Sequence, residues 1–586
     1  MKFLRNLLAA ILGTLIAFGI LFFMFFVFFA LVSSAEDGVT VESNSVLELS
    51  FSEPISDYEG KDEADPFGGL FSEGNGLDDI LHTIAIAADD DRIKALSLTT
   101  SFIQAGLAQT QEIREALEEF QLKGKAIYAY SDYFTQKDYY LASVADSIYL
   151  NPVGGMDFKG LATEILYLKE LQEKTGVKIE VIRHGKYKSA VEPYLYDAMS
   201  AENREQITAL ISSIWNTMLE DISDARDISV EELNKTADTL GARNPKLAIA
   251  AGLIDGAAHF DEYEAMLKTK LNLTAEDDIN YVSFSEYQRE ALGKKIWSGK
   301  DKIAVIYAQG EILYGEGGKD YIGQGIIQKA LQKAKNNDKI KAVVLRVNSP
   351  GGSALVSDII WREVELVKAV KPVVVSFGNV AASGVYYIGA GGDKIFAEPT
   401  TVTGSIGVFG TIPNVHELSK TIGVNAEQVG TNKNSVEYSV FEPMTDTFKK
   451  VVEESIEDTY DVFLERVAQG RNMTLAEVDS LAQGRVWSGT DAVQNGLVDE
   501  LGSLEDAIYA AAELAELDEF GIRKYPKYKS DFERFMEDFG GARSEWLTQY
   551  VEEEIGTEAY QVLQDLKKAK QFEGVQARLP YSLNIK

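Results

Sequence analysis

The sequence predicts an α/β protein that contains the same unit twice. Along the second half, segments typical of strands alternate with segments typical of helices, and this alternation favours a parallel sheet flanked by helices. The expected strands are 303–309, 341–347, 372–377 and 394–397, and the expected helices are 323–336, 353–369 and 383–390. A longer helical region closes each unit, Ser200 to Arg226 in the first and Thr445 to Gly470 in the second.

Three short segments of the first half recur in the second half, which predicts an internal duplication. Asp91–Leu96 returns as Asp338–Val343, and Tyr139-Tyr140 returns as Tyr386-Tyr387, both 247 residues later. Gly252–Asp255 returns as Gly496–Asp499, 244 residues later. We therefore divide the chain into residues 1–37, a cytoplasmic tip and membrane anchor; 38–295, the first α/β unit; 296–520, the second α/β unit; and 521–586, a C-terminal extension.

The composition excludes several classes of function. The 57 basic and 91 acidic residues leave a net charge of −34, which argues against nucleic acid as a partner, because phosphate binding needs concentrated Lys and Arg. The acidity is better explained as a solvated surface. The chain has no cysteine, so disulfides, thiolate metal sites and a cysteine nucleophile are excluded. We predict no cofactor and no metal.

An apolar run near the N-terminus predicts a membrane anchor. Leu7 to Val32 spans 26 residues in which Thr14 has the only polar side chain, and about 20 suffice to cross a bilayer. Lys2 and Arg5 precede the run, so the positive-inside rule places the N-terminus in the cytoplasm and the body of the protein outside it. A cleaved signal peptide is the alternative, since 33–35 resembles a cleavage site, but its apolar core would be about twice the usual length.

The stretch from Pro372 to Ser405 carries the candidate nucleophile. Its apolar start suits a buried strand, a turn is expected at Gly378-Asn379, and Ser383 stands where the next helix begins. Backbone N–H groups at a helix start favour negative charge, so an oxyanion formed there would be stabilised. The preceding strand ends in Gly351-Gly352, whose backbone can approach a ligand closely and aim N–H groups at it. Together these are the parts needed for acyl transfer.

The first half lacks these parts. The repeat maps Ser383 onto Gln136, and it maps Gly351 and Gly352 onto Gln104 and Ala105. The first half therefore cannot perform the same chemistry alone.

A serine nucleophile needs a base, and the segment Gly185–Pro193 offers Lys186 and Lys188. A lysine serves only when neutral, which requires burial to lower its pKa from about 10.4 to about 7 to 8. Spacing does not choose between the two. Aligning Gly185 with Gly430 adds Lys433 as a candidate within the second half.

Five motifs, taken in order, resemble the signal peptide peptidase A (protease IV) family of serine–lysine peptidases, in its long, duplicated form. They are Tyr187–Pro193, Asn348–Gly352, Ala381–Gly384, Thr403–Gly407 and Gly496–Asp499. The resemblance implies two tandem crotonase/Clp-protease-like units after an N-terminal transmembrane helix. It also implies Ser383 as nucleophile, Lys188 as general base, and an oxyanion hole formed by Gly351, Gly352 and Gly384. Val385 departs from the family, where many relatives carry a second glycine.

The resulting expectation is a membrane-anchored serine endopeptidase that cleaves released signal peptides and other unfolded apolar peptides with a Ser–Lys dyad. Its body would lie on the periplasmic or extracytoplasmic side of the inner membrane, and the resemblance implies a homotetramer. The alternative is a catalytically silent, membrane-anchored scaffold of the same fold that binds peptides. A thioester-processing enzyme of crotonase type would leave the anchor and the serine–lysine pair unexplained. Ser405 is expected to be structural or to line the substrate site.

Overall fold

The computed structural model describes residues 41–51, 53–60, 75–99, 101–436, 439–528 and 575–578, with short pieces between 5 and 24. The predicted anchor at 7–32 falls largely outside these residues, and only the helical pieces 11–14, 16–21 and 23–24 represent it. Among the helices described, none is both long enough and apolar enough to cross a membrane.

The sheet of the first unit consists of six parallel strands. Their spatial order is β9 (Tyr281–Ser283), β1 (Ser45–Leu49), β4 (Ile93–Leu98), β5 (Ala126–Phe134), β6 (Ser147–Met156) and β8 (Gly256–Ala257). The second unit repeats this order with parallel strands β21 (Gly521–Tyr525), β10 (Lys302–Gln309), β13 (Ile340–Ser349), β15 (Val373–Ala382), β16 (Lys394–Ala397) and β20 (Glu500–Leu501). The prediction of a duplicated α/β fold with parallel sheets is confirmed.

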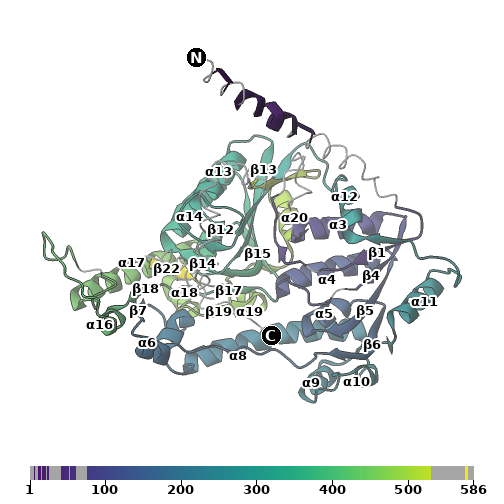
Figure 1. The fold of residues 1–586 in the computed structure, drawn as a ribbon, viewed down its shortest axis with the longest axis horizontal. Helices are drawn as coiled ribbons and strands as arrows, with labels where there is room; N and C mark the ends of the chain where they lie inside the picture. Colours follow the sequence, from purple (N-terminus) through teal and green to yellow (C-terminus); the bar gives the residue numbers. More distant parts are fainter. Residues whose placement is uncertain are drawn as a thin grey trace.

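The helices correspond in the same way (Figure 1). The matching pairs are α3 (Leu77–Asp89) with α13 (Gln324–Lys335), α4 (Leu107–Leu122) with α14 (Ala354–Lys368), α5 (Gln136–Ala142) with α15 (Gly384–Gly389), α6 (Lys169–Thr175) with α16 (His416–Thr421), α8 (Ala201–Arg226) with α17 (Asp446–Arg471), α9 (Val230–Asp238) with α18 (Leu475–Leu481), α10 (Pro245–Ala250) with α19 (Gly489–Gln494), and α11 (Phe260–Lys270) with α20 (Leu504–Leu514). Helices α7 (Glu192–Leu195) and α12 (Phe284–Ala291) belong to the first unit.

Equivalent hydrogen bonds also recur in the two units. The hydroxyl of Tyr139 donates to the carbonyl of Leu253, and that of Tyr386 donates to the carbonyl of Leu497, each at 2.8 Å. These bonds connect α5 and α15 to the Gly-Leu turn of their own unit. The repeated residues therefore hold the same structural position in both halves.

Successive side chains of β13 point to opposite faces of the sheet, and both faces are covered. Val343 and Leu345 face the cluster that contains α13 and α14, whereas Ala342 and Val344 face the cluster that contains α20. Because both faces are covered, the strand reads as an almost continuous apolar run.

The turn expected at Gly378-Asn379 does not occur. Strand β15 continues to Ala382: Val374–Phe377 pair with β16, and Val380–Ala382 pair with β17 (Val402–Gly404). The pairing of β15 with β13 shifts register between Val347 and Ser349, so the strand changes partners without ending. Ser383, the next residue, therefore lies beside the end of β17.

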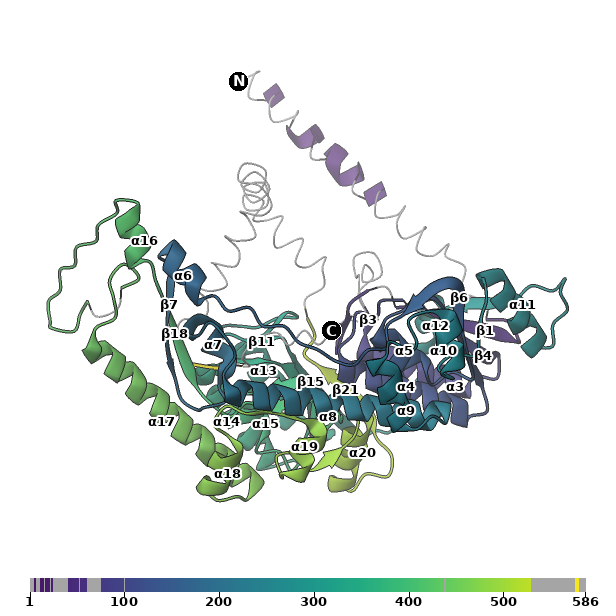
Figure 2. The same ribbon diagram turned by 90° about the horizontal axis from the view of Figure 1, so that it is seen from below.

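A third sheet joins the two halves. Its order is β12 (Tyr321–Ile322), β11 (Glu311–Ile312), β14 (Gly351–Ser353), β22 (Val575–Arg578), β18 (Phe409–Asn414) and β7 (Lys178–Arg183). Strand β7 belongs to the first half and pairs antiparallel with β18 of the second half along six residue pairs. Figure 2 shows β7 and α8 reaching from the first unit to the side of the second. The segment after β7 is therefore delivered to the second unit.

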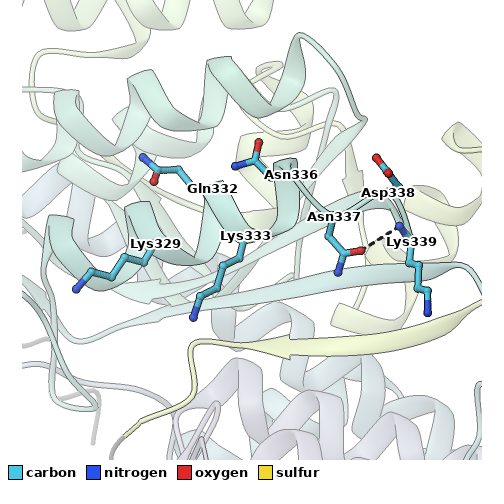
Figure 3. Close-up of a pocket in the computed structure, with 7 residues that line it drawn as sticks. All are labelled: Lys329, Gln332, Lys333, Asn336, Asn337, Asp338 and Lys339. Atoms are coloured by element: carbon cyan, nitrogen blue, oxygen red, sulfur yellow. Dashed lines mark hydrogen bonds between the residues drawn. The ribbon is translucent and has the colours of Figure 1, made fainter.

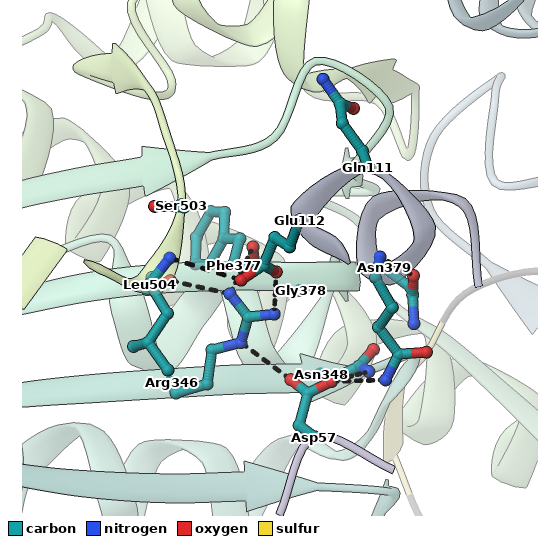
Figure 4. A network of polar contacts seen from close by, with 12 residues as sticks. Asp57, Gln111, Glu112, Arg346, Asn348, Phe377, Gly378, Asn379, Ser503 and Leu504 are labelled. Carbon is teal, nitrogen blue, oxygen red and sulfur yellow. Dashed lines mark hydrogen bonds and ion pairs between the residues drawn. The ribbon is translucent and has the colours of Figure 1, made fainter. Parts of the chain in front are cut away.

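A buried ionic network also connects the halves (Figure 4). Arg346 on β13 pairs with Asp57 at 2.8 Å and with Glu112 on α4. Asp57 also accepts a bond from Asn348 at 3.0 Å. All three charged side chains are at most 2% exposed. A buried charge is tolerated only when it is paired and hydrogen-bonded, so this network requires the first unit to sit in one position on the second.

A further buried acid, Glu398, lies close to this network. Burial, followed by repulsion from Glu115 and Glu112, raises the pKa of Glu398 well above its ordinary value. Its two carboxyl oxygens have no hydrogen-bond partner among the residues that the structure describes. Both facts favour the neutral, protonated form of Glu398.

Candidate active site

Ser383 is the N-cap residue of α15 and is fully buried. Its backbone has φ 59° and ψ −114°, a conformation that costs a residue with a side chain about 1–3 kcal/mol. The bond from its N–H to the carbonyl of Gly404, 2.8 Å long, holds this turn in place. This strained backbone lies where β15, β17 and α15 meet, and its conformation sets the direction of the Ser383 side chain.

Lys188 comes from the other half of the chain and reaches this serine. The residue follows β7, and its Nζ lies 2.8 Å from Ser383 Oγ. The same Nζ lies 2.9 Å from the carbonyl oxygen of Ser405 and 3.0 Å from Ser405 Oγ. The family resemblance implied Lys188 and Ser383 as partners, and the structure brings them together within one chain.

The surroundings of Lys188 favour a neutral amine. The side chain is fully buried, and this burial lowers the pKa of Lys188 well below its ordinary value. A neutral amine has two N–H donors and one lone pair. Two donors can serve the oxygens of Ser405, which leaves the lone pair to accept the hydroxyl proton of Ser383. The three contacts at Nζ therefore match the form that acts as a base.

The backbone of Lys188 is held by both halves. Arg183 donates to its carbonyl at 2.9 Å, and the N–H of the preceding Tyr187 donates to Gln483 at 2.9 Å. Gly484 lies so close that a Cβ added to it would be 2.6 Å from Lys188 Cα. A Cβ on Gly407 would be 3.2 Å from Lys188 Cδ. Because Gly407 and Gly484 have no side chain, they leave the space that Lys188 occupies against the second unit.

The glycines expected at the oxyanion hole lie beside the serine. Gly351 and Gly352 form β14 with φ 96° and 154°, and Gly384 is the first residue of α15, where an N–H has no partner within the helix. A Cβ on Gly351 would be 3.0 Å from the amide nitrogen of Gly384. The N–H of Gly351 itself donates to Ser349 Oγ at 3.1 Å, so that amide is engaged within its own turn.

The corresponding positions of the first half are filled by local contacts. Gln136 begins α5, and its side-chain oxygen accepts bonds from the amides of Lys159 and Gly160 at 3.0 and 2.9 Å. Lys433 is exposed on the segment between α16 and α17, and no contact joins it to Ser383. Of the lysines considered, the structure places Lys188 at the serine.

Sequence reasoning missed the residues that position the lysine. Ser405, expected to be structural or to line the substrate site, has φ 51° and turns both of its oxygens toward Nζ. Gln206 on α8 donates to the carbonyl of Tyr187 at 3.0 Å and to Ser189 Oγ at 2.8 Å. Its spacing from Lys188 carries no recognisable motif.

A surface pocket of about 720 Å³ lies elsewhere, at the end of α13 and the turn before β13 (Figure 3). It is open and polar, and no hydroxyl side chain lines it. Its lining residues are Lys329, Gln332, Lys333, Asn336, Asn337, Asp338 and Lys339. The pocket therefore lacks a nucleophile of the kind found at Ser383.

Comparison with known proteins identifies relatives of this chain among peptidases. The model of peptidase family S49 matches residues 119–274 and 365–518, so one match contains Lys188 and the other contains Ser383. Protease 4 of Haemophilus influenzae is 38% identical over 446 residues, which cover 74% of this chain and 72% of that protein. Protease 4 of Salmonella typhi is 36% identical over 82% of this chain and 78% of its own length. The chloroplastic serine protease SPPA of Arabidopsis thaliana is 32% identical over 81% of this chain and 70% of its own length.

The lowered pKa of Lys188 predicts how the reactivity of Ser383 depends on pH. Protonated Lys188 cannot accept the serine proton, so the second-order rate constant for labelling by a fluorophosphonate should rise with pH through the lysine pKa. Since burial lowers this pKa, the rate should level off well below the ordinary lysine value of about 10.4. Labelling should be measured from pH 5 to 10, with hydrolysis of the probe followed at each pH as a control. A rate that still rises tenfold per unit near pH 10 would contradict this account of Lys188.

Proposed function

Because the chain belongs to peptidase family S49, we propose that it is a serine endopeptidase with Ser383 as nucleophile and Lys188 as general base. The observation that carries the proposal is the 2.8 Å contact between a fully buried amine and a fully buried hydroxyl. A buried lysine without a carboxylate in contact is costly as an ammonium, and a neutral lysine at a serine hydroxyl has the position of a general base.

The proposed mechanism is acyl transfer. Lys188 accepts the proton of Ser383 as Oγ attacks the scissile carbonyl carbon, and the amide C–N bond breaks as Lys188 returns that proton to the leaving amine. Water then attacks the acyl-enzyme with Lys188 again as base, which releases the acid and restores Ser383. Ser405 holds Nζ in place through both steps.

We propose that the oxyanion is bound by the N–H of Gly384 together with an N–H of the Gly351-Gly352 turn. Two such donors aimed at the developing charge supply much of the rate enhancement in acyl transfer. Use of Gly351 would require its N–H to exchange the bond that it makes to Ser349, whereas Gly384 is the first residue of α15, where an N–H has no partner within the helix.

The proposed substrates are released signal peptides and other unfolded apolar peptides. Full burial of Ser383 and Lys188 supports this class, because the hydroxyl can be approached by an extended chain and not by the surface of a folded domain. The signal peptide part of the proposal rests on the family resemblance.

We further propose that residues 7–32 anchor the protein in the inner membrane with the catalytic body outside the cytoplasm, and that it assembles as a homotetramer. The support is the length of the apolar run and the position of Lys2 and Arg5 before it. The tetramer rests on the resemblance, and sedimentation of the detergent-solubilised protein as a monomer would contradict it.

Ser383→Ala should abolish hydrolysis of a fluorogenic apolar peptide, with a loss of several orders of magnitude in kcat. The change removes one oxygen from a buried position, so the circular dichroism spectrum and Tm should stay near those of the parent. The parent should be labelled by a fluorophosphonate at Ser383, as mapped by mass spectrometry. Ser383-independent hydrolysis would overturn the mechanism, and peptide binding by a parent that never hydrolyses would favour the scaffold alternative.

The proposed topology predicts the outcome of limited proteolysis. Protease added to intact spheroplasts should digest residues beyond about 36, since the positive-inside rule places them outside the cytoplasm. A cytoplasmic protein serves as the control for spheroplast integrity. Protection that is lost only after lysis would reverse the proposed orientation.

A further inference from the structure

Arg485 of the second unit contacts the surroundings of Lys188 through both its backbone and its side chain. Its carbonyl oxygen accepts the N–H of Ser405 at 2.7 Å. Ser405 in turn holds the Lys188 amine through its own carbonyl oxygen and its hydroxyl, at 2.9 and 3.0 Å. The backbone of Arg485 is therefore linked by one hydrogen bond to the residue that holds the Lys188 amine.

The side chain of Arg485 packs on the residue next to the candidate base. Its guanidinium carbon lies 5.0 Å from the centroid of the Tyr187 ring and 4.4 Å from that of the Trp487 ring. Tyr187 belongs to the first unit and Trp487 to the second. A guanidinium is attracted to an aromatic face, and more strongly where water is excluded. The Arg485 side chain is only 20% exposed, so this contact holds Tyr187, and with it the segment that carries Lys188, against the second unit.

Hydrogen bonds to α8 reinforce the same contact. Arg485 Nη1 donates to Glu205 on α8 at 2.9 Å and to the Tyr187 hydroxyl at 3.3 Å. The next residue, Val486, donates its N–H to Gln206 Oε1 at 3.2 Å, and Gln206 Nε2 donates to the Tyr187 carbonyl at 3.0 Å. Tyr187 is thus held at its ring, its hydroxyl and its carbonyl, and each of these contacts leads to Arg485 or to its neighbour Val486.

We propose that Arg485 is a positioning residue for the base, which fixes the distance between Lys188 Nζ and Ser383 Oγ across the junction between the two units. This inference rests on the proposed function, because it assumes that Lys188 accepts the proton of Ser383. Proton transfer requires the two heavy atoms to lie within about 2.6–3.2 Å, and a misplacement of about 1 Å can cost about 100-fold in rate. Since the two residues come from different units, their distance depends on the contacts that join the units near Lys188.

A positioning role predicts a specific kinetic signature. Loss of the Arg485 side chain lets the segment of Lys188 move away from Ser383, so kcat falls, while the contacts made by the bound peptide, and therefore KM, stay the same. Because burial, and not a neighbouring charge, lowers the pKa of Lys188, the midpoint of the pH dependence should also stay the same. Removal of a residue that acted through its positive charge would instead shift that midpoint upward.

Substitutions in the full-length chain separate these effects. Arg485→Met removes the guanidinium and keeps much of the side-chain volume, and Arg485→Lys keeps the charge but not the planar group that stacks. Tyr187→Leu removes the ring on which Arg485 packs, and Tyr187→Phe keeps it. Ser213→Ala is the matched control, since it removes another bond between α8 and the second unit, 2.7 Å long and made to Ser488, that does not involve the segment of Lys188.

The experiment measures kcat and KM on one fluorogenic peptide, together with the rate of fluorophosphonate labelling at Ser383 from pH 5 to 10. Rates are expressed per Ser383 labelled at completion, so a loss of folded protein does not count as a loss of kcat. We expect Arg485→Met, Arg485→Lys and Tyr187→Leu each to lower kcat by about 30- to 100-fold, with KM within about twofold and an unchanged pH midpoint.

The conservative and control variants should behave differently. Tyr187→Phe keeps the aromatic face and should recover to within about fivefold of the parent, and Ser213→Ala, which loses one hydrogen bond, should stay within about threefold. The double variant Arg485→Met with Tyr187→Leu should lie within about threefold of the slower single variant, because both substitutions remove the same contact.

A kcat of Arg485→Met within about threefold of the parent would overturn the proposal, since a 1 Å misplacement of the base costs more than that. Effects of Arg485→Met and Tyr187→Leu that multiply in the double variant would show that the two side chains act independently, and would contradict the proposed contact. A pH midpoint that rises in Arg485→Met would assign Arg485 an electrostatic role instead. These outcomes leave the peptidase intact, whereas absence of Ser383-dependent hydrolysis in the parent would refute the proposed function, so the two failures are distinguishable.

Discussion

The arrangement of this protein depends on placing one lysine amine against a serine hydroxyl in the interior, with no carboxylate of the described residues in contact with that amine. Lys188 Nζ meets Ser383 Oγ at 2.8 Å and the two oxygens of Ser405 at 2.9 and 3.0 Å. The burial that lowers the pKa of Lys188 requires walls on every side. Those walls are Gly407 and Gly484 of the second unit and the turn after β7 of the first unit. Neither half can build this environment alone.

The duplication provides the two halves with complementary tasks. The second unit keeps the strained serine and the glycine turn, and the first unit supplies the lysine through β7, which pairs with β18. Because the lysine crosses between units, their relative position must be fixed to within a hydrogen-bond length. The buried pairs of Arg346 with Asp57 and Glu112 fix this position, since a shift of either unit would leave charges buried and unpaired.

Much of this could be predicted from the sequence, for identifiable reasons. The alternating strand and helix patterns and the recurring Asp91–Leu96 segment are local signals, and they gave the duplicated α/β fold. The serine at a helix start and the paired glycines are also local. The choice of Lys188 over Lys186 and Lys433 came from the family resemblance, because the contact spans 195 residues of sequence. Ser405, Gly484 and Gln206 act through tertiary packing alone. The continuation of β15 past Gly378 was missed because Gly-Asn is a strong turn signal that pairing with β17 overrides.

We propose that the base for Ser383 comes from the first half. The measurement that tests it most directly is kcat/KM of Lys188→Met and Lys433→Met on one peptide. Both variants remove a single lysine amine, but Lys188 is buried at the serine and Lys433 is exposed. We predict that Lys188→Met lowers kcat/KM by several orders of magnitude, as loss of a general base does, and that Lys433→Met stays within about tenfold of the parent. The reverse ranking would place the base in the second half and contradict the account.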